Sequence, residues 1–329
     1  MKPEVVKSPL EPDDVEAEAQ AKAKAIPPES TPVTLHSGAD LLDEYIGKLR
    51  TGDVPQLHKL GDALDGLEVC AGLITIIGAP PGAGKTALAS QIVFEACQCN
   101  PDLIAYVANA EMSFQAIARR ELTRITRIDS DKIRFANLSE WELSQIEEAA
   151  AELRKSLERV KFILNPTHGS LLELLDHKPG LIVVDYLQKF SPPDVDARIG
   201  VNQVMTTLRR LASHGMSVLA LSATKRDAKG GHASKELSLS SFRESGEVEF
   251  NADSAYVLRD DGSMEGKEFV RKVTLGHVKN RHGKKLDRTL RFDMPKMSFE
   301  QIEEPEPQRE KIFDDWNNAD QGFVFEGMQ

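Results

Sequence analysis

The chain has 329 residues, of which 40% are apolar and 28% charged, as in an ordinary globular protein. No apolar run reaches the roughly 18–20 residues of a membrane span, and the first residues lack the apolar core of a signal peptide, so we expect no membrane contact and a cytoplasmic location. The net charge of −11 gives no global electrostatic argument for nucleic-acid binding, so any basic surface must be local.

The first sixty residues differ in composition from the rest of the chain. Residues 1–34 are rich in Pro, Glu, Ala and Lys, which predicts a disordered segment. Apolar residues then recur at helical spacing, and residues 35–60 are predicted to form a linker helix, at 38–50, with a connector. Its apolar stripe consists of Leu41, Leu42, Tyr45, Ile46 and Leu49.

Residues 61–302 alternate between apolar strands and helical patterns. The strands are expected at 73–78, 103–109, 160–164, 181–187 and 217–223. The helices are expected at 85–97, 113–126, 139–158 and 200–213, and Ser139 and Glu142 form a capping-box pattern. Shorter strands are expected at 253–260, 272–280 and 286–293. This alternation predicts an α/β fold with a mostly parallel central sheet flanked by helices on both faces.

The cysteines and the last residues carry weaker signals. Cys97 and Cys99 have no second ligand pair nearby, so free thiols in a reducing compartment are favoured over a metal site. Residues 303–329 form an acidic tail, predicted to be flexible, that ends with the aromatic residues Trp316, Phe323 and Phe325. These aromatics fit a docking peptide for a replication protein partner, and a plain flexible end fits equally well.

A glycine-rich loop lies between a predicted strand and a predicted helix, which is the context of a P-loop. Its backbone N–H groups and the following helix N-terminus favour the phosphates of a nucleotide, and we expect ATP. Lys85 would contact the β- and γ-phosphates, and the Thr86 hydroxyl would hold Mg²⁺. The nucleotide-binding residues are Ala79, Pro80, Pro81, Gly82, Ala83, Gly84, Lys85, Thr86 and Ala87.

Two carboxylates follow predicted strands and can share the crevice with this loop. Asp185 closes an apolar strand, where it can order Mg²⁺ or instead cap the following turn. Glu111 follows the strand at 103–109 and can act as a general base, although a Glu that begins a helix more often complements the helix dipole. The P-loop favours the metal-binding interpretation for Asp185.

Five motifs in order resemble one known family. They are APPGAGKTA at 79–87, AEMS at 110–113, VVDYLQ at 183–188, FRESGEVEFNAD at 242–253 and VKNRHG at 278–283. Together they resemble the RecA-like ATPase domain of the DnaB-type replicative helicases, over residues 38–300. The resemblance implies that Glu111 is the catalytic base and that Asp185 belongs to the Mg²⁺ shell. It also implies that Lys279 and Arg281 reach the nucleotide of a neighbouring subunit; without it, a solvated basic hairpin would be favoured.

The resemblance further implies two pore loops that hold single-stranded DNA by its backbone. One loop would lie around residues 242–253, and the other is the basic stretch 225–235, whose bland alternative is a charged surface loop. The implied DNA-binding residues are Lys225, Arg226, Lys229, Arg243, Glu244 and Gly246. The linker helix would pack on an adjacent subunit of a homo-oligomeric ring, expected to be a hexamer, or else on its own domain.

Two features depart from the family pattern. Only a short segment precedes the linker helix, where the family has an N-terminal helical domain, so we expect the role to differ from that of a standard replisome helicase. The family's γ-phosphate-sensing Gln is replaced by Ala223, whose side chain forms no hydrogen bond. Either Thr224 takes over that contact, or the coupling between hydrolysis and the pore loops is altered.

The sequence thus predicts an ATP-dependent, ring-forming DNA helicase or translocase that uses Mg²⁺. A RecA-like ATPase of repair or recombination, without processive unwinding, is the first alternative. A nucleotide-binding interaction module that regulates a resident helicase is the second, and Ala223 with the aromatic tail fits it. Retention of Lys85, Glu111, Asp185 and Arg281 argues against this second alternative.

Overall fold

The computed structural model describes residues 35–193, 195–224, 242, 250–264 and 266–302. The predictions for residues 1–34 and for the tail at 303–329 lie outside these ranges. The chain divides into two units between Val54 and Pro55. None of the described helices is long and apolar enough to cross a bilayer.

The elements alternate along the larger unit as expected. The strands are β1 (Ile74–Ala79), β2 (Ala105–Asn109), β3 (Val160–Ile163), β4 (Leu181–Asp185), β5 (Ser217–Ala223), β6 (Ser254–Met264), β7 (Lys267–Asn280), β8 (Arg288–Asp293) and β9 (Ser298–Gln301). The helices are α3 (Lys85–Cys99), α4 (Phe114–Thr126), α5 (Ser130–Arg134), α6 (Glu140–Leu157), α7 (His168–Glu173) and α8 (Ala197–Ser213), with 3₁₀ turns η1 (Leu174–Asp176) and η2 (Leu187–Lys189).

The smaller unit contains the linker helix, α2 (Gly38–Thr51). The Ser37 side chain caps its start by accepting a hydrogen bond from the Ala39 N–H, and Gly52, at φ 70°, ends it in the left-handed region. The helix predicted at 38–50 is therefore confirmed. Its apolar stripe is solvent-accessible, since the five side chains are between 38% and 58% exposed.

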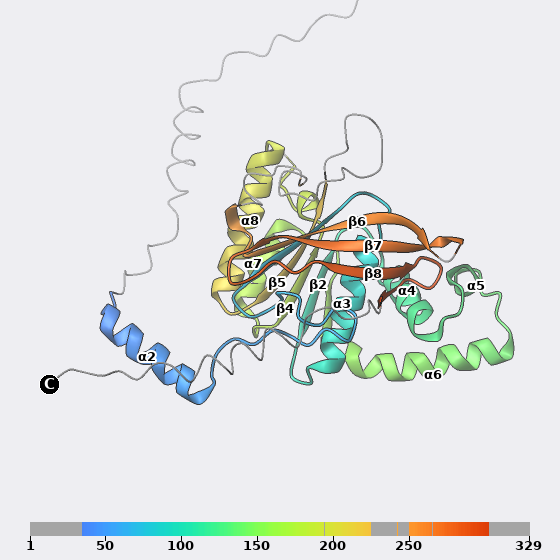
Figure 1. Ribbon diagram of the computed structural model, residues 1–329, viewed down its shortest axis with the longest axis horizontal. Coiled ribbons are helices and arrows are strands. Elements are labelled where there is room, and N and C mark those ends of the chain that lie inside the picture. The colour runs from blue at the N-terminus through green and yellow to red at the C-terminus, as the bar shows by residue number, and fades with distance from the viewer. Residues whose placement is uncertain (1–34, 194, 225–241, 243–249, 265, 303–329) are drawn as a thin grey trace, which may run out of the picture. The chain divides into compact units, whose positions relative to one another are not determined.

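Among the described residues, nine strands form one sheet in the order β3-β2-β4-β5-β1-β6-β7-β8-β9 (Figure 1). The six strands from β3 to β6 run parallel, and β7, β8 and β9 add antiparallel pairs at one side. A parallel sheet must be covered on both faces, and Figure 1 shows α7 and α8 on one side and α3 with α4 and α6 on the other. The predicted mostly parallel α/β fold is confirmed.

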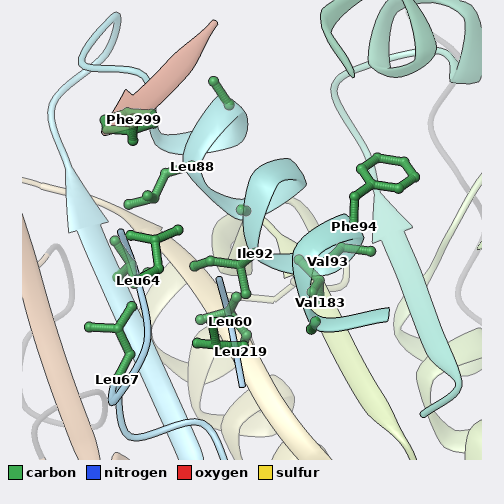
Figure 2. Close-up of a cluster of buried hydrophobic side chains, with 14 of the residues drawn as sticks. Leu60, Leu64, Leu67, Leu88, Ile92, Val93, Phe94, Val183, Leu219 and Phe299 are labelled. Carbon is green, nitrogen blue, oxygen red and sulfur yellow. The ribbon is translucent and has the colours of Figure 1, made fainter. Parts of the chain in front are cut away.

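Side chains of alternating direction on β1 supply both cores. Ile77 belongs to the core under α3, whereas Ile74 and Ile76 belong to the core under α8. Figure 2 shows the first core, in which Leu88 and Ile92 of α3 face the sheet. The P-loop helix is therefore fixed to the sheet by apolar packing.

The antiparallel side of the sheet differs from the prediction. The strands β6 and β7 have 11 and 14 residues, so they are not short, and β9 was not expected. The far ends of β6 and β7 are half-buried or exposed except for Val270, which removes the apolar pattern that marks a strand. Phe299 is the single large apolar residue of β9, too little for a periodic signal.

The capping box at α6 is confirmed by reciprocal bonds. The Glu142 N–H donates to Ser139 Oγ at 3.2 Å, and the Ser139 N–H donates to Glu142 Oε2 at 2.9 Å. Cys97 is buried near the end of α3 and Cys99 is exposed, both as free thiols.

A buried charge cluster joins α3 to α4. Arg124 Nη1 contacts Glu95 Oε1 at 2.8 Å and also pairs with Glu121, which is 1% exposed. Burial raises the pKa of Glu95 to about 7. The positive charge of Arg124 lowers this pKa, but the negative charge of the nearby Glu121 opposes that effect. One guanidinium thus neutralises only one of two buried carboxylates.

This cluster makes stability depend on pH. The folded-state pKa of Glu95 lies above its ordinary value of 4.5, so the folded protein binds the proton more tightly. Its stabilising contribution is complete below pH 4.5 and falls as the pH rises towards about 7, by about 3 kcal/mol at most. We expect Glu95→Gln to flatten this fall, measured by urea unfolding at several pH values between 5 and 8. The exposed Glu152→Gln is the control, and equal slopes in both variants would contradict the assignment.

Candidate nucleotide site

The P-loop runs from the end of β1 to the start of α3, as predicted. Gly82 and Gly84 have φ values of 82° and 88°, which L side chains rarely adopt. A Cβ on Gly84 would also lie 2.7 Å from the Phe292 ring and 3.0 Å from Phe299. Gly84 is therefore required both by the loop conformation and by close packing against β8 and β9.

Lys85 begins α3 and lies beside the end of β4. Its Nζ lies 4.7 Å from the ring centroid of Tyr186, within range of a cation–π interaction. Burial lowers the pKa of Lys85, and the charges of Asp185 and Glu111 oppose this shift. The three charged residues of the prediction are thus close enough to interact.

Asp185 ends β4 and lies next to the P-loop threonine. The Thr86 hydroxyl donates to Asp185 Oδ2 at 2.8 Å, and Asn109 Nδ2 donates to the same oxygen at 3.0 Å. The buried Asp185 Oδ1 has no hydrogen-bond partner among the described residues. Burial raises the pKa of Asp185, with the bond from Thr86 and the charge of Lys85 acting against it.

These oxygens fit a magnesium ion held mainly by a nucleotide. Within the described ranges, no group of three or more His, Cys, Asp or Glu could hold a metal. Mg²⁺ needs no such cluster in nucleotide sites, where one or two protein oxygens, phosphates and water complete its shell. The unpartnered Asp185 Oδ1 beside Thr86 is the arrangement expected for the metal side of such a site.

Glu111 follows β2 at the same edge of the sheet. Asn109 Oδ1 accepts hydrogen bonds from the backbone N–H groups of Glu111 and Met112, at 2.9 and 2.8 Å, which fixes the turn. The Glu111 side chain is exposed, so an attacking water can reach it. Arg120 of α4 interacts electrostatically with both Asp185 and Glu111. Asn109 and Arg120 thus belong to the site.

Ala223, at the end of β5, lies beside the side chain of Gln188. The Ala223 N–H donates to Gln188 Oε1 at 3.3 Å, and Gln188 Nε2 donates to Ser222 Oγ at 3.1 Å. An amide side chain therefore contacts the end of β5, but it comes from the turn after β4. Thr224 is buried, and its N–H donates to the Ala79 carbonyl at 3.3 Å.

Lys279 and Arg281 lie at the opposite end of the sheet from the P-loop. Lys279 pairs with Ala255 of β6, and the Arg281 N–H donates to the Asp253 carbonyl at 2.9 Å. The Asp253 N–H in turn donates to the carbonyl of Ile74, the first residue of β1. Because the P-loop follows the last residue of β1, Arg281 and the P-loop lie at opposite ends of this strand.

The predicted DNA-binding residues lie outside the described ranges, but two flanking residues are described. Thr224 and Phe242 form an isolated antiparallel bridge next to the end of β5. Phe242 is fully buried against Gly78, where a Cβ would lie 2.5 Å from its ring. Thr224 and Phe242 therefore both lie near the strand that leads into the P-loop.

Four residues of these sites were not among the predicted site residues. Asn109 ends a predicted strand, Gln188 and Asp253 belong to motifs quoted above, and Arg120 lies in the predicted helix at 113–126. The signal for Gln188 and Asp253 was their position inside motifs that carry other functional residues.

Comparison with known proteins assigns the family. The model of the DnaB-like helicase C-terminal domain matches residues 54–301. The chain belongs to the DnaB-like helicase family. It therefore carries a RecA-like ATPase domain of the replicative helicase type, as the five motifs predicted.

Two curated relatives show how far the similarity extends. A probable plasmid replicative DNA helicase of Chlamydia trachomatis is 30% identical over 246 residues, covering 71% of this chain and 51% of that protein. The replicative DNA helicase DnaB of Rickettsia typhi is 24% identical over 217 residues, covering 59% and 43%. The chain thus spans about half the length of the curated relatives it matches.

Solved structures support the fold independently. A DnaB-like replicative helicase, described with its interactions with primase, matches with a TM-score of 0.67 and 20% identity, covering 88% of this chain and 74% of that one. A solved ATPase domain matches with the same TM-score and identity, covering 82% of this chain and all of that chain. At this identity the likeness shows the fold alone.

Proposed function

We propose that this protein is an ATP-dependent DNA helicase or translocase whose ATP sites lie between subunits of a homo-oligomeric ring, expected to be a hexamer. Lys85, Thr86, Asp185 and Glu111 would form one side of each site. Lys279 and Arg281 of a neighbouring copy would form the other. Membership of the DnaB-like family supports the helicase class.

The observation that carries the proposal is the separation of the two halves of the site. Arg281 is hydrogen-bonded to Asp253, whose N–H in turn donates to the first residue of β1, and the P-loop follows the sixth residue of β1. A six-residue strand spans about 17 Å between its first and last Cα atoms. Lys85 and the guanidinium of Arg281 in one copy are therefore expected to serve different nucleotides.

The residues have separate chemical tasks in this proposal. Glu111 would accept a proton from the attacking water, and Lys85 would bind the phosphates. Thr86 and Asp185 would hold Mg²⁺, which neutralises phosphate charge when bound. Arg281 from the neighbour would stabilise negative charge that develops on the transferred phosphoryl group.

Single-stranded DNA is the proposed nucleic-acid substrate. Thr224 and Phe242, the described residues that flank the basic stretch 225–241, form a bridge next to the end of β5, which supports a link between that stretch and the nucleotide site. The exposed stripe of α2 supports packing on another copy, because five partly exposed apolar side chains are unfavourable in water. A replication protein remains a proposed partner of the acidic tail. The proposed divisions of the chain remain residues 1–34, 35–60, 61–302 and 303–329.

The test is an ATPase assay with and without single-stranded DNA, combined with mass measurement in the presence of nucleotide. We expect DNA to stimulate hydrolysis and nucleotide to favour a closed oligomer. A stable monomer whose hydrolysis ignores DNA would contradict the proposal. Stimulation without strand displacement on a forked duplex would instead favour the repair-type ATPase.

Ala223 favours one second candidate, a nucleotide-binding module that regulates a resident helicase. The amide that contacts the end of β5 is that of Gln188, bonded to Ser222 and the Ala223 backbone, so the expected sensor is replaced by a structural contact. This candidate predicts no hydrolysis by the purified chain, together with co-purification of another helicase.

A further inference from the structure

A buried carboxylate organises the residues around Arg281. Asp253 is 3% exposed and immediately precedes β6. Its Oδ1 accepts a bond from Arg281 Nη1 at 2.9 Å, and its Oδ2 contacts Arg209 Nη2 of α8 at 3.0 Å. The Ile74 N–H also donates to Oδ2, at 2.8 Å. One carboxylate therefore joins the basic hairpin end, a helix and the first residue of β1.

The Arg281 guanidinium is hydrogen-bonded by two of its nitrogens, and the side chain is partly exposed to solvent. Its Nη2 donates to the Phe250 carbonyl at 2.6 Å, while the side chain remains 48% exposed. Within the described part of the chain, these two bonds engage two of the five N–H donors of the group. The remaining donors can meet an anion without loss of the bonds to Asp253 and Phe250.

A cation that is already held in place loses less conformational entropy on binding an anion than a mobile one does. A free arginine side chain loses rotamer freedom when it binds phosphate, whereas this one is already restrained by two bonds. Two guanidiniums against one carboxylate also leave a net positive charge on this cluster of Arg209, Arg281 and Asp253, which favours an anionic partner.

We infer that Asp253 is a positioning residue that presents Arg281 to the nucleotide bound by a neighbouring copy. The inference rests on the proposed function, because it assigns a task to a residue that serves the inter-subunit site. Arg281 touches the phosphates, and Asp253 acts through it.

Asp253→Asn tests the inference, because it keeps the size of the side chain and removes its charge. We expect kcat for ATP hydrolysis to fall about 10- to 100-fold, as for a misplaced catalytic group, with the KM for ATP unchanged. Asp260→Asn is the matched control, because Asp260 pairs with Arg271 on the same two strands, away from Arg281. That variant should hydrolyse ATP as the wild type does.

Mixed oligomers separate positioning from general damage. A Lys85→Ala copy lacks a working P-loop but retains Asp253 and Arg281, so it should restore hydrolysis at the intact P-loop of an Asp253→Asn copy. If Asp253 only stabilised β1 through Ile74, the variant's own P-loop would fail and mixing would restore nothing. That result, or wild-type kcat for Asp253→Asn alone, would overturn the inference.

Two further variants complete the test. If Asp253→Asn unfolds at assay temperature, Asp253→Glu keeps the charge but moves the carboxylate, and the same loss and rescue are expected; wild-type kcat would overturn the inference. Asp253→Asn combined with Arg281→Ala should be no slower than Arg281→Ala alone. Should Lys85→Ala also fail to rescue Arg281→Ala, the inter-subunit site itself, and not only the role of Asp253, would be wrong.

Discussion

Glu111→Gln is expected to lower kcat for ATP hydrolysis by about 10²- to 10⁴-fold, the contribution typical of a general base. Binding of ATP should remain, because Lys85 and Thr86 are unchanged and the amide keeps the shape of the carboxylate. The Asn109 bonds to the backbone at Glu111 and Met112 do not involve the substituted carboxylate, so the turn should persist. Single-turnover hydrolysis and equilibrium binding of a fluorescent nucleotide would measure the two effects separately.

The control for this variant is Glu147→Gln, an exposed position on α6. It should hydrolyse ATP at the wild-type rate. If Glu111→Gln also did so, Glu111 would be a residue that complements the dipole of the following helix, and the base would have to be sought elsewhere.

Arg281→Ala is expected to reduce kcat by about 10³-fold or more, as for other cations delivered between subunits. Nucleotide binding to its own P-loop should be retained, because the residue lies at the other end of β1. Mixing it with Lys85→Ala should restore hydrolysis, since each variant supplies the half that the other lacks. Steady-state ATPase rates, measured over a range of mixing ratios, should pass through a maximum, because each pure variant is inactive and the mixture is active.

Lys284→Ala provides the matched change of one exposed cation in the same hairpin end. Its hydrolysis rate should stay close to that of the wild type. Loss of activity in Arg281→Ala without rescue at any ratio would mean that its partner phosphates, if any, belong to the same copy.

The sequence was most informative where apolar periodicity and loop chemistry coincide. The strand before the P-loop, the loop and α3 were predicted within two residues, because burial on both faces and the glycine pattern give independent signals. The lengths of β6 and β7 were underestimated because their outer halves are mostly polar and only partly buried. The backbone hydrogen bonds between β6 and β7 determine the length of these strands there, and such bonds produce no pattern of side chains in the sequence.

The site was predicted as a set of reacting groups, without the residues that hold them. Lys85 and Asp185 were recognised because phosphate and metal chemistry demand their residue types. Asn109, Gln188 and Asp253 act by hydrogen bonds to residues 2 to 179 positions away in sequence. The long-range contacts among these arise only when the sheet brings strands together, so the sequence pattern alone assigns them no partner.

The location of Arg281 at one end of β1 and of the P-loop at the other has a consequence for symmetry. Under the proposed arrangement two different surfaces meet, so the interface is heterologous, and each added copy leaves one surface of each kind unpaired until the series closes. A pair of copies would have one complete site, whereas a closed ring would have as many sites as subunits. The rotation between successive copies, rather than the chemistry of the nucleotide site, would then decide between a ring and an open helical filament.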